Sequence, residues 1–201
     1  VHDNAVLVAA VVVVAILGGA LVMSWPSRQE KKERVAAADY YAAKKAIVVK
    51  DENPMLAQFG IQGDPTPESL KAAAEGFEKA ATSYAGTHTA LRAWLAAGDA
   101  HLLLKDYEKA DTAYRHAEGH GTPAERYSAL AGRAAAQEGR TLWGDAAEIY
   151  RRMASDTSLP FRDESTIALA RVLGRDGKRD EAHTLLTKFE AEFPDSQMIP
   201  Q

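Results

Sequence analysis

The sequence predicts an all-α protein in which one N-terminal transmembrane helix precedes an α-solenoid of about eight helices, that is, about three and a half helical hairpins. Three observations support this prediction. An aliphatic segment without charge lies near the N-terminus, a side-chain pattern recurs every 36 residues behind it, and no segment alternates polar and apolar residues as a half-buried strand would. We expect an anchor over residues 1–27, a juxtamembrane helix and loop over 28–66, and a repeat domain over 67–201.

The N-terminal segment has the length and apolarity of a membrane anchor. No residue from Asn4 to Ser27 is charged, and residues 5–23 are almost purely aliphatic. A helix of about 20 residues spans the hydrocarbon core of a bilayer. A cleaved signal peptide is the alternative, but its apolar core is usually only about 7–15 residues long. We therefore expect contact with the lipid bilayer through residues 5–25, with Trp25 at the interface.

The orientation of the anchor is open from the residues alone. Arg28, Lys31, Lys32 and Arg34 follow the aliphatic run directly. The positive-inside rule then places this cluster, and the chain behind it, in the cytoplasm.

The whole-chain composition excludes several classes of function. The 201 residues are 46% hydrophobic and 26% charged, which is ordinary for a globular protein. The net charge of -4 offers no basic excess for a phosphate backbone, so we expect no nucleic-acid partner. Cysteine is absent, which excludes disulfides, thiolate metal sites and cysteine nucleophiles.

The second helices of the predicted hairpins share one pattern, in which an alanine is followed by a bulky residue four positions later and then by a closing proline. The members are Ala110, Tyr114 and Pro123; Ala146, Tyr150 and Pro160; and Ala182, Leu186 and Pro194. Because the three alanines lie 36 residues apart, the units are equivalent in sequence.

The first helices carry small residues that would let paired helices approach closely. The clearest pattern runs from Trp94 through Ala97-Gly98 to His101, and the next units offer Ala131-Gly132 and Leu169-Ala170. Aligning Gly132 with Gly98 predicts two extra residues in the turn near Gly139-Arg140-Thr141.

A divergent fourth unit precedes these three. We expect its first helix over about Glu33–Val49 and its second over Leu70–Tyr84, where Thr66 and Pro67 form an N-cap and first-turn proline. Between them lies a long loop that contains an apolar patch, Leu56–Ile61.

These patterns resemble the tetratricopeptide repeat (TPR), W-x2-L-G-x2-Y followed by Y-x2-A-x3-F-x2-A, with His101 in place of the usual Tyr and Ala97 in place of Leu. The first helices of TPR hairpins line a concave groove. Counted from the motif, the predicted partner-binding groove consists of Arg92, Leu95, Asp99, Leu102, Arg126, Arg133, Gln137, Arg171 and Arg175. Guanidinium groups bind carboxylates well, so the groove suits an acidic or extended peptide. Alternatively, these arginines pair with neighbouring Asp and Glu side chains on solvated helix faces.

The order of parts resembles the YfgM-like ancillary subunits of the SecYEG translocon. Tyr84-Ala85-Gly86-Thr87 leading into Ala90-Leu91-Arg92-Ala93 carries this resemblance. It implies a single-pass protein of the bacterial inner membrane with periplasmic repeats, partnered by translocon subunits and periplasmic chaperones. Phe193-Pro194-Asp195-Ser196 is also similar to TPR proteins of other envelope assemblies, in secretion, motility, outer-membrane biogenesis or cell division, and these stay the alternative.

Signs of catalysis or of metal binding are few. The sequence lacks the glycine-rich, nucleophile-elbow and zinc-binding motifs of common enzymes. His116 and His120 have metal-ligand spacing but no third ligand nearby, and His101 replaces a core residue. Asp163-Glu164 and Asp180-Glu181 suit the first turns of helices. We expect a non-enzymatic protein without cofactor or metal, whose last hairpin leaves Leu185 and Phe189 partly exposed.

Overall fold

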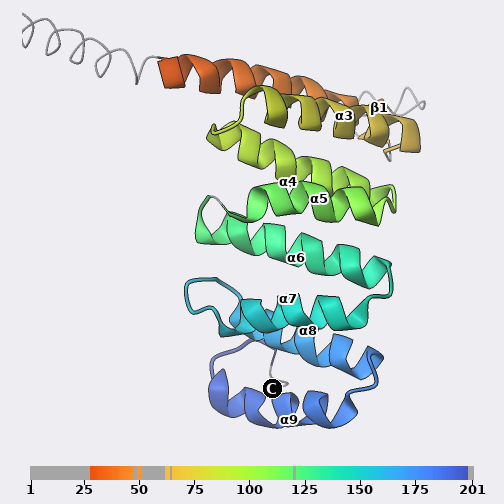
Figure 1. The fold of residues 1–201 in the computed structure, drawn as a ribbon, viewed down its shortest axis with the longest axis vertical. Helices are drawn as coiled ribbons and strands as arrows, with labels where there is room; N and C mark the ends of the chain where they lie inside the picture. The colour runs from red at the N-terminus through yellow and green to blue at the C-terminus, as the bar shows by residue number, and fades with distance from the viewer. Residues whose placement is uncertain (1–27, 48, 51–61, 64, 120, 199–201) are drawn as a thin grey trace, which may run out of the picture.

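The computed structural model describes residues 28–47, 49–50, 62–63, 65–119 and 121–198. Eight helices follow one another through these residues in a single stack (Figure 1). Residues 28–47 form the first helix, and the others are α3 (Pro67–Ser83), α4 (His88–Leu103), α5 (Tyr107–Glu118), α6 (Pro123–Gly139), α7 (Trp143–Ser155), α8 (Arg162–Arg175) and α9 (Arg179–Glu192). From α3 onward each helix packs against the next, so the predicted α-solenoid is confirmed.

The predicted membrane anchor lies outside the described residues, as does the apolar patch Leu56–Ile61. Among the helices that the structure describes, none has both the length and the apolarity that crossing a bilayer requires.

The first helix differs in its bounds from the predicted Glu33–Val49. It is already helical at residue 28, and Val49–Lys50 (β1) instead pairs antiparallel with Gln62–Gly63 (β2), Val49 opposite Gly63. The predicted start of α3 is confirmed, because Thr66 Oγ1 accepts a hydrogen bond of 3.1 Å from the amide of Ser69.

The 36-residue period is visible in the backbone. Each turn within a hairpin has one residue in the left-handed region: Lys105 (φ 60°), Thr141 (φ 60°) and Gly177 (φ 80°). The amide of the following residue, at 106, 142 or 178, donates a 2.9 Å hydrogen bond to the carbonyl five residues earlier. These are Schellman motifs, which end a helix by satisfying its last carbonyl groups. The three turns are therefore structurally equivalent.

This equivalence corrects the predicted register of the second hairpin. Its turn has no extra residues, so the partner of Gly98 in α6 is Ala134, not Gly132. Arg133 and Gln137 then correspond to Ala97 and His101, which are both buried. Gln137 is likewise buried, with only 7% of its surface exposed, although it was predicted to line a groove.

The ring of Tyr114 explains why glycine is found at both position 98 and position 132. The Tyr114 ring is wedged between α4 and α6, where a Cβ added at Gly98 would lie 2.7 Å from ring carbons and one added at Gly132 within 2.5 Å of both Cε atoms. Normal contacts between carbon atoms are about 3.5–4.0 Å. Glycine is thus required at two non-equivalent positions, one in the hairpin of Tyr114 and one in the next hairpin.

The first helix belongs to the same stack. Its Tyr40 ring packs 5.2 Å from the ring of Phe77 in α3, and Ala43 lies so close to Gly76 that an added Cβ would be 2.8 Å away. The Glu33 carboxylate accepts hydrogen bonds from the first two amides of α4, those of His88 and Thr89. It therefore caps the positive end of that helix.

The C-terminal end is covered more fully than expected. Phe189 is buried and packs on Phe193 with 5.3 Å between ring centroids, so the prediction that Phe189 stays partly exposed was wrong, whereas Leu185 is partly exposed as predicted. Leu186 is the exposed residue instead. The Ser196 hydroxyl donates a 2.7 Å hydrogen bond to Asp163 Oδ2, which ties the final turn back to α8.

Candidate partner-binding site

The first helices α4 and α6 lie closer together than the helices that alternate with them. α4 contacts α6 directly, whereas hollows open between α3 and α5 and between α5 and α7. We call the open surface of α4, α6 and α8 the inner face. With the corrected register, its members are Arg92, Leu95, Asp99, Leu102, Leu103, Ser128, Ala131, Ala135, Glu138, Glu164, Ile167, Arg171 and Arg175.

The inner face has an apolar centre. Leu95 and Leu102 are half-buried, and Leu103 is 65% exposed. Ala131 and Ala135 continue this surface on α6 and are also half-buried. Because these side chains are small or aliphatic, the centre of the face can bury apolar groups of a partner.

Charged residues of the inner face are held by tyrosines from the second helices. The Tyr114 hydroxyl donates a 2.5 Å hydrogen bond to Asp99 Oδ1, and the Tyr150 hydroxyl donates one of 2.9 Å to Glu138 Oε1. Burial first, and then the neighbouring carboxylate, raise the pKa of each tyrosine. Both tyrosines therefore stay neutral donors that fix the carboxylates in place.

Arg171 and Glu138 join neighbouring first helices. The guanidinium of Arg171 donates two hydrogen bonds to Glu138, at 2.5 and 2.8 Å. Burial raises the pKa of Glu138, but the hydrogen bonds from Arg171 and Tyr150 outweigh this and lower it below the usual value. Glu138 is thus a charged inner-face residue that the sequence analysis missed.

Two predicted groove arginines lie elsewhere. The Arg133 side chain is only 15% exposed and donates to Asp111 Oδ1 at 3.0 Å and to Glu118, both in α5. Arg126 pairs with Asp156, 3.0 Å away, beyond the end of α7. These two arginines link successive hairpins through Asp and Glu side chains, as the alternative interpretation expected, but Arg133 is largely buried and does not lie on a solvated helix face.

Arg92 and Arg175 are the inner-face arginines that stack on aromatic rings. The Arg92 guanidinium lies 5.5 Å from the centroid of the Tyr40 ring, and that of Arg175 lies 6.0 Å from the Trp143 ring. Among the described residues, neither forms an ion pair with a carboxylate. A carboxylate of a partner can therefore bind them without displacing an internal one.

A hollow on the opposite side of the stack was not foreseen from the sequence. It has a volume of about 660 Å³ between α3 and α5, and Trp94 is among its lining residues. Trp94 also lines a neighbouring hollow of about 400 Å³, where its ring stacks on that of His116 with 4.4 Å between centroids. The sequence pattern identified Trp94 only as the first residue of the repeat motif.

Two of the three histidines considered from the sequence, His101 and His116, contact neighbouring side chains. His101 is buried as predicted, and its Nε2 lies 2.8 Å from Glu78 Oε1. His116 stacks on Trp94, and His120 lies outside the described residues. Within the described part of the chain, no three His, Asp or Glu side chains are grouped closely enough to hold a metal ion.

Comparison with known proteins adds no assignment. No protein-family model matches the sequence, and no curated protein matches it.

Proposed function

We propose that this protein is a non-enzymatic, membrane-anchored scaffold of the TPR type that binds protein partners in the bacterial envelope. The observation that supports this most is the inner face, where Arg92 and Arg175, which form no ion pair among the described residues, flank an apolar centre around Leu102 and Leu103. Apolar centres with charged rims are typical of protein-binding surfaces.

The chemistry of the inner face suits an extended partner segment with apolar and acidic side chains. The apolar groups bury against Leu102, Leu103 and Ala135, and an acidic group pairs with Arg175. Asp99 and Glu138, fixed by their tyrosines, would repel a carboxylate placed beside them and so help to set the register of the segment.

The proposed setting is the protein translocon of the inner membrane, where the protein would serve as an ancillary subunit or chaperone adaptor with periplasmic repeats. The support is the resemblance in layout described above, together with the solenoid. Crosslinking in native membranes, followed by identification of the partners, tests it. A translocon subunit or periplasmic chaperone among the adducts is the expected result. Adducts only with subunits of another envelope assembly would assign the protein to that assembly instead.

The inner face itself is tested by paired substitutions. We expect Leu103→Asp with Arg175→Glu to abolish capture of the identified partner, because the two substitutions remove both the apolar contact and the guanidinium of Arg175. Thr112→Asp with Lys188→Glu makes the same charge changes on exposed positions of the second helices α5 and α9 and is the matched control. Capture that survives the two inner-face substitutions, or falls equally in the control, would contradict the proposal.

Protease treatment of intact spheroplasts determines on which side of the membrane the repeats lie. Protection of the repeats would refute periplasmic placement.

A further inference from the structure

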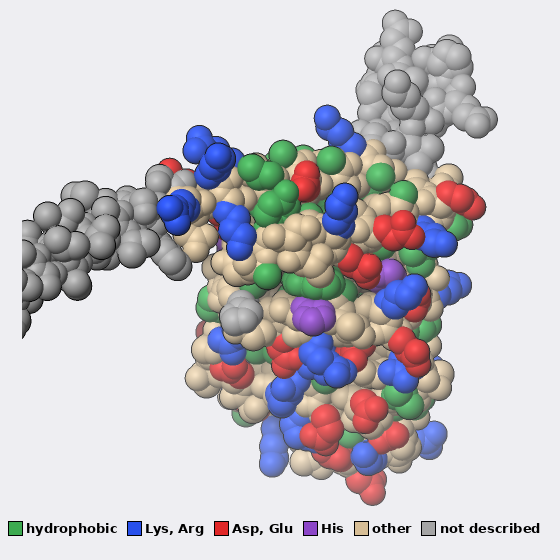
Figure 2. All heavy atoms as spheres, turned by 45° about the horizontal axis from the view of Figure 1, so that its top comes forward, with side chains coloured by type: hydrophobic (Ala, Val, Ile, Leu, Met, Phe, Trp, Pro, Cys, Tyr) green, Lys and Arg blue, Asp and Glu red, His purple; other side chains and the backbone are tan. Residues whose placement is uncertain are grey.

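The first helix has one face that no described part of the chain covers. Its opposite side contains the buried Ala36 and packs on α3 through Tyr40 and Ala43. The outward stripe follows helical spacing, and all its members are exposed. They are Lys31, Arg34, Val35, Ala38, Tyr41, Ala42 and Lys45. This stripe forms the end of the solenoid, where Figure 2 shows basic and hydrophobic side chains gathered together.

The charge of the first helix is segregated between its two sides. Residues 28–47 contain six Lys or Arg against three Asp or Glu. Two of these acids face the protein, since Glu33 caps α4 and Asp39 Oδ2 accepts a 2.7 Å hydrogen bond from the Tyr84 hydroxyl. Glu30 is the remaining acid, so the outward stripe is strongly basic.

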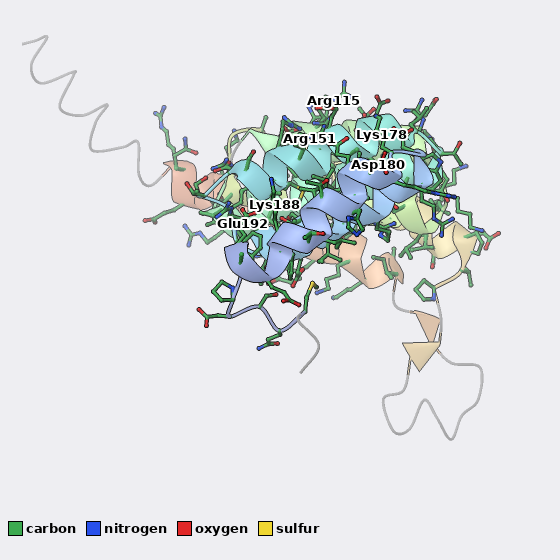
Figure 3. All side chains as sticks on the ribbon, turned by 90° about the horizontal axis from the view of Figure 1, so that it is seen from below. Arg115, Arg151, Lys178, Asp180, Lys188 and Glu192 are labelled. Carbon is green, nitrogen blue, oxygen red and sulfur yellow. The ribbon has the colours of Figure 1, made fainter. Side chains whose placement is uncertain are left out.

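The opposite end of the stack has no such basic excess. Residues 178–198 contain five Asp or Glu against three Lys or Arg, and Figure 3 looks onto this end, where α9 presents Asp180 and Glu192 near its two ends. Glu181 and Glu192 pair with Arg151 and Arg162, at 2.8 and 3.7 Å, so the charges at this end largely balance and the excess of positive charge lies at the first helix. An anionic surface would therefore attract the first helix more strongly than α9.

Apolar side chains accompany the basic ones on the stripe. Tyr41 is 56% exposed and Val35 is 44% exposed, with Ala38 and Ala42 between them. Helices that lie in the membrane interface combine basic side chains with an exposed aromatic and aliphatic surface in this way, and tyrosine prefers the headgroup level. A second copy is a poorer occupant, because two-fold pairing of this stripe would place like charges opposite each other.

We propose that the outward stripe of the first helix lies on the anionic headgroups of the bilayer, so that the solenoid stands on the membrane with α9 pointing away from it. This inference rests on the proposed anchor, since the aliphatic run ends at Met23, five residues before the described helix begins. The inference goes beyond anchoring, because it states which surface of the solenoid faces lipid. In this arrangement the inner face lies at the side of the stack and stays accessible to partners.

The absence of cysteine allows a site-specific test on the full-length protein. Single cysteines, Ala38→Cys on the stripe and Ala191→Cys on α9, take an environment-sensitive fluorophore. The labelled proteins are reconstituted in vesicles of phosphatidylglycerol mixed with phosphatidylcholine, or of phosphatidylcholine alone, with quencher-bearing lipid headgroups in both. We expect strong quenching at position 38 in the anionic vesicles and little at position 191.

Charge reversal separates docking from anchoring. In K31E/R34E/K45E we expect quenching at position 38 to fall to the level of position 191, while the protein still floats with the vesicles and keeps its helical circular dichroism. Flotation without quenching at position 38 in the unreversed protein would overturn the docking but leave the anchor intact. Failure to float would refute the anchor. Quenching that is unaffected by charge reversal, or crosslinking between two copies at position 38 without quenching, would also overturn the inference.

Discussion

The contact of Tyr114 with Gly132 predicts that replacing this glycine by alanine destabilises the folded protein. Gly132→Ala places a methyl group within 2.5 Å of both Cε atoms of a ring that is only 2% exposed. The ring cannot retreat toward α4, because Gly98 already lies against its other side. We therefore expect the helices α4 and α6 to be forced apart, or the ring to leave its rotamer.

The magnitude follows from two opposing terms. Overpacking a well-filled core costs about 1–3 kcal/mol. Replacing a glycine inside a helix by alanine contributes about 0.5–1 kcal/mol of stability. The net expectation for Gly132→Ala is a loss of about 1–2 kcal/mol. Gly174→Ala in α8 is the matched control, because a Cβ there meets nothing within 4 Å, and we expect a gain of up to about 1 kcal/mol.

Urea unfolding, monitored by far-ultraviolet circular dichroism, measures the free energy of unfolding of both variants. The two substitutions are chemically identical, so the account predicts opposite signs and a separation of about 2–3 kcal/mol. A smaller side chain at position 114 should relieve the clash, and we expect Gly132→Ala to cost less in a Tyr114→Leu background. If Gly132→Ala were as stable as Gly174→Ala, the wedge between α4 and α6 would be refuted.

Three further predictions concern ionic contacts. We expect Glu33→Gln to cost about 1 kcal/mol at neutral pH by weakening the cap on α4. Burial raises the pKa of Glu33, but its hydrogen bonds lower the pKa by more. The difference in the free energy of unfolding between variant and wild type should therefore vanish as the pH falls through this lowered pKa. A pH-independent difference in urea unfolding would contradict this. Arg133→Met should cost about 1–3 kcal/mol, because the buried Asp111 loses one of its two arginine partners and keeps Arg115, and a loss well below about 1 kcal/mol in urea unfolding would contradict this. Glu138→Gln should destabilise the folded protein near neutral pH. The effect should be lost in acid, because the pKa of Glu138 is also lowered. Arg171→Gln should show the same pH dependence, because it removes the other partner of this ion pair.

The sequence was sufficient to predict the stack of helices. Small and large side chains recur every 36 residues, and the backbone repeats with the same period at Lys105, Thr141 and Gly177. The register within α6 could not be predicted, because a glycine in a repeat shows that something packs closely there without showing which helix it is. Gly132 faces the ring of the preceding hairpin, and alignment with Gly98 moved the predicted groove by two residues.

The groove arginines show a second limit. Arg133 and Arg171 look alike in sequence, yet the first is enclosed by α5 and the second lies on the inner face beside Glu138. The distinction depends on acids that are 15 to 33 residues away in the chain and are brought close only by the stacking of hairpins. The hollow at Trp94 depends likewise on the spacing of α3 and α5, which the helical pattern does not encode.

Site-specific photo-crosslinking tests the central claim, that partners bind the inner face, most directly. A photoreactive residue is placed in turn at Leu103 and Ala135 on the inner face, and at Thr112 and Glu148 on exposed positions of second helices. After irradiation of native membranes, we predict that the same partner is crosslinked from both inner-face positions and from neither control position. Adducts from the controls alone, or equally from all four positions, would contradict the account.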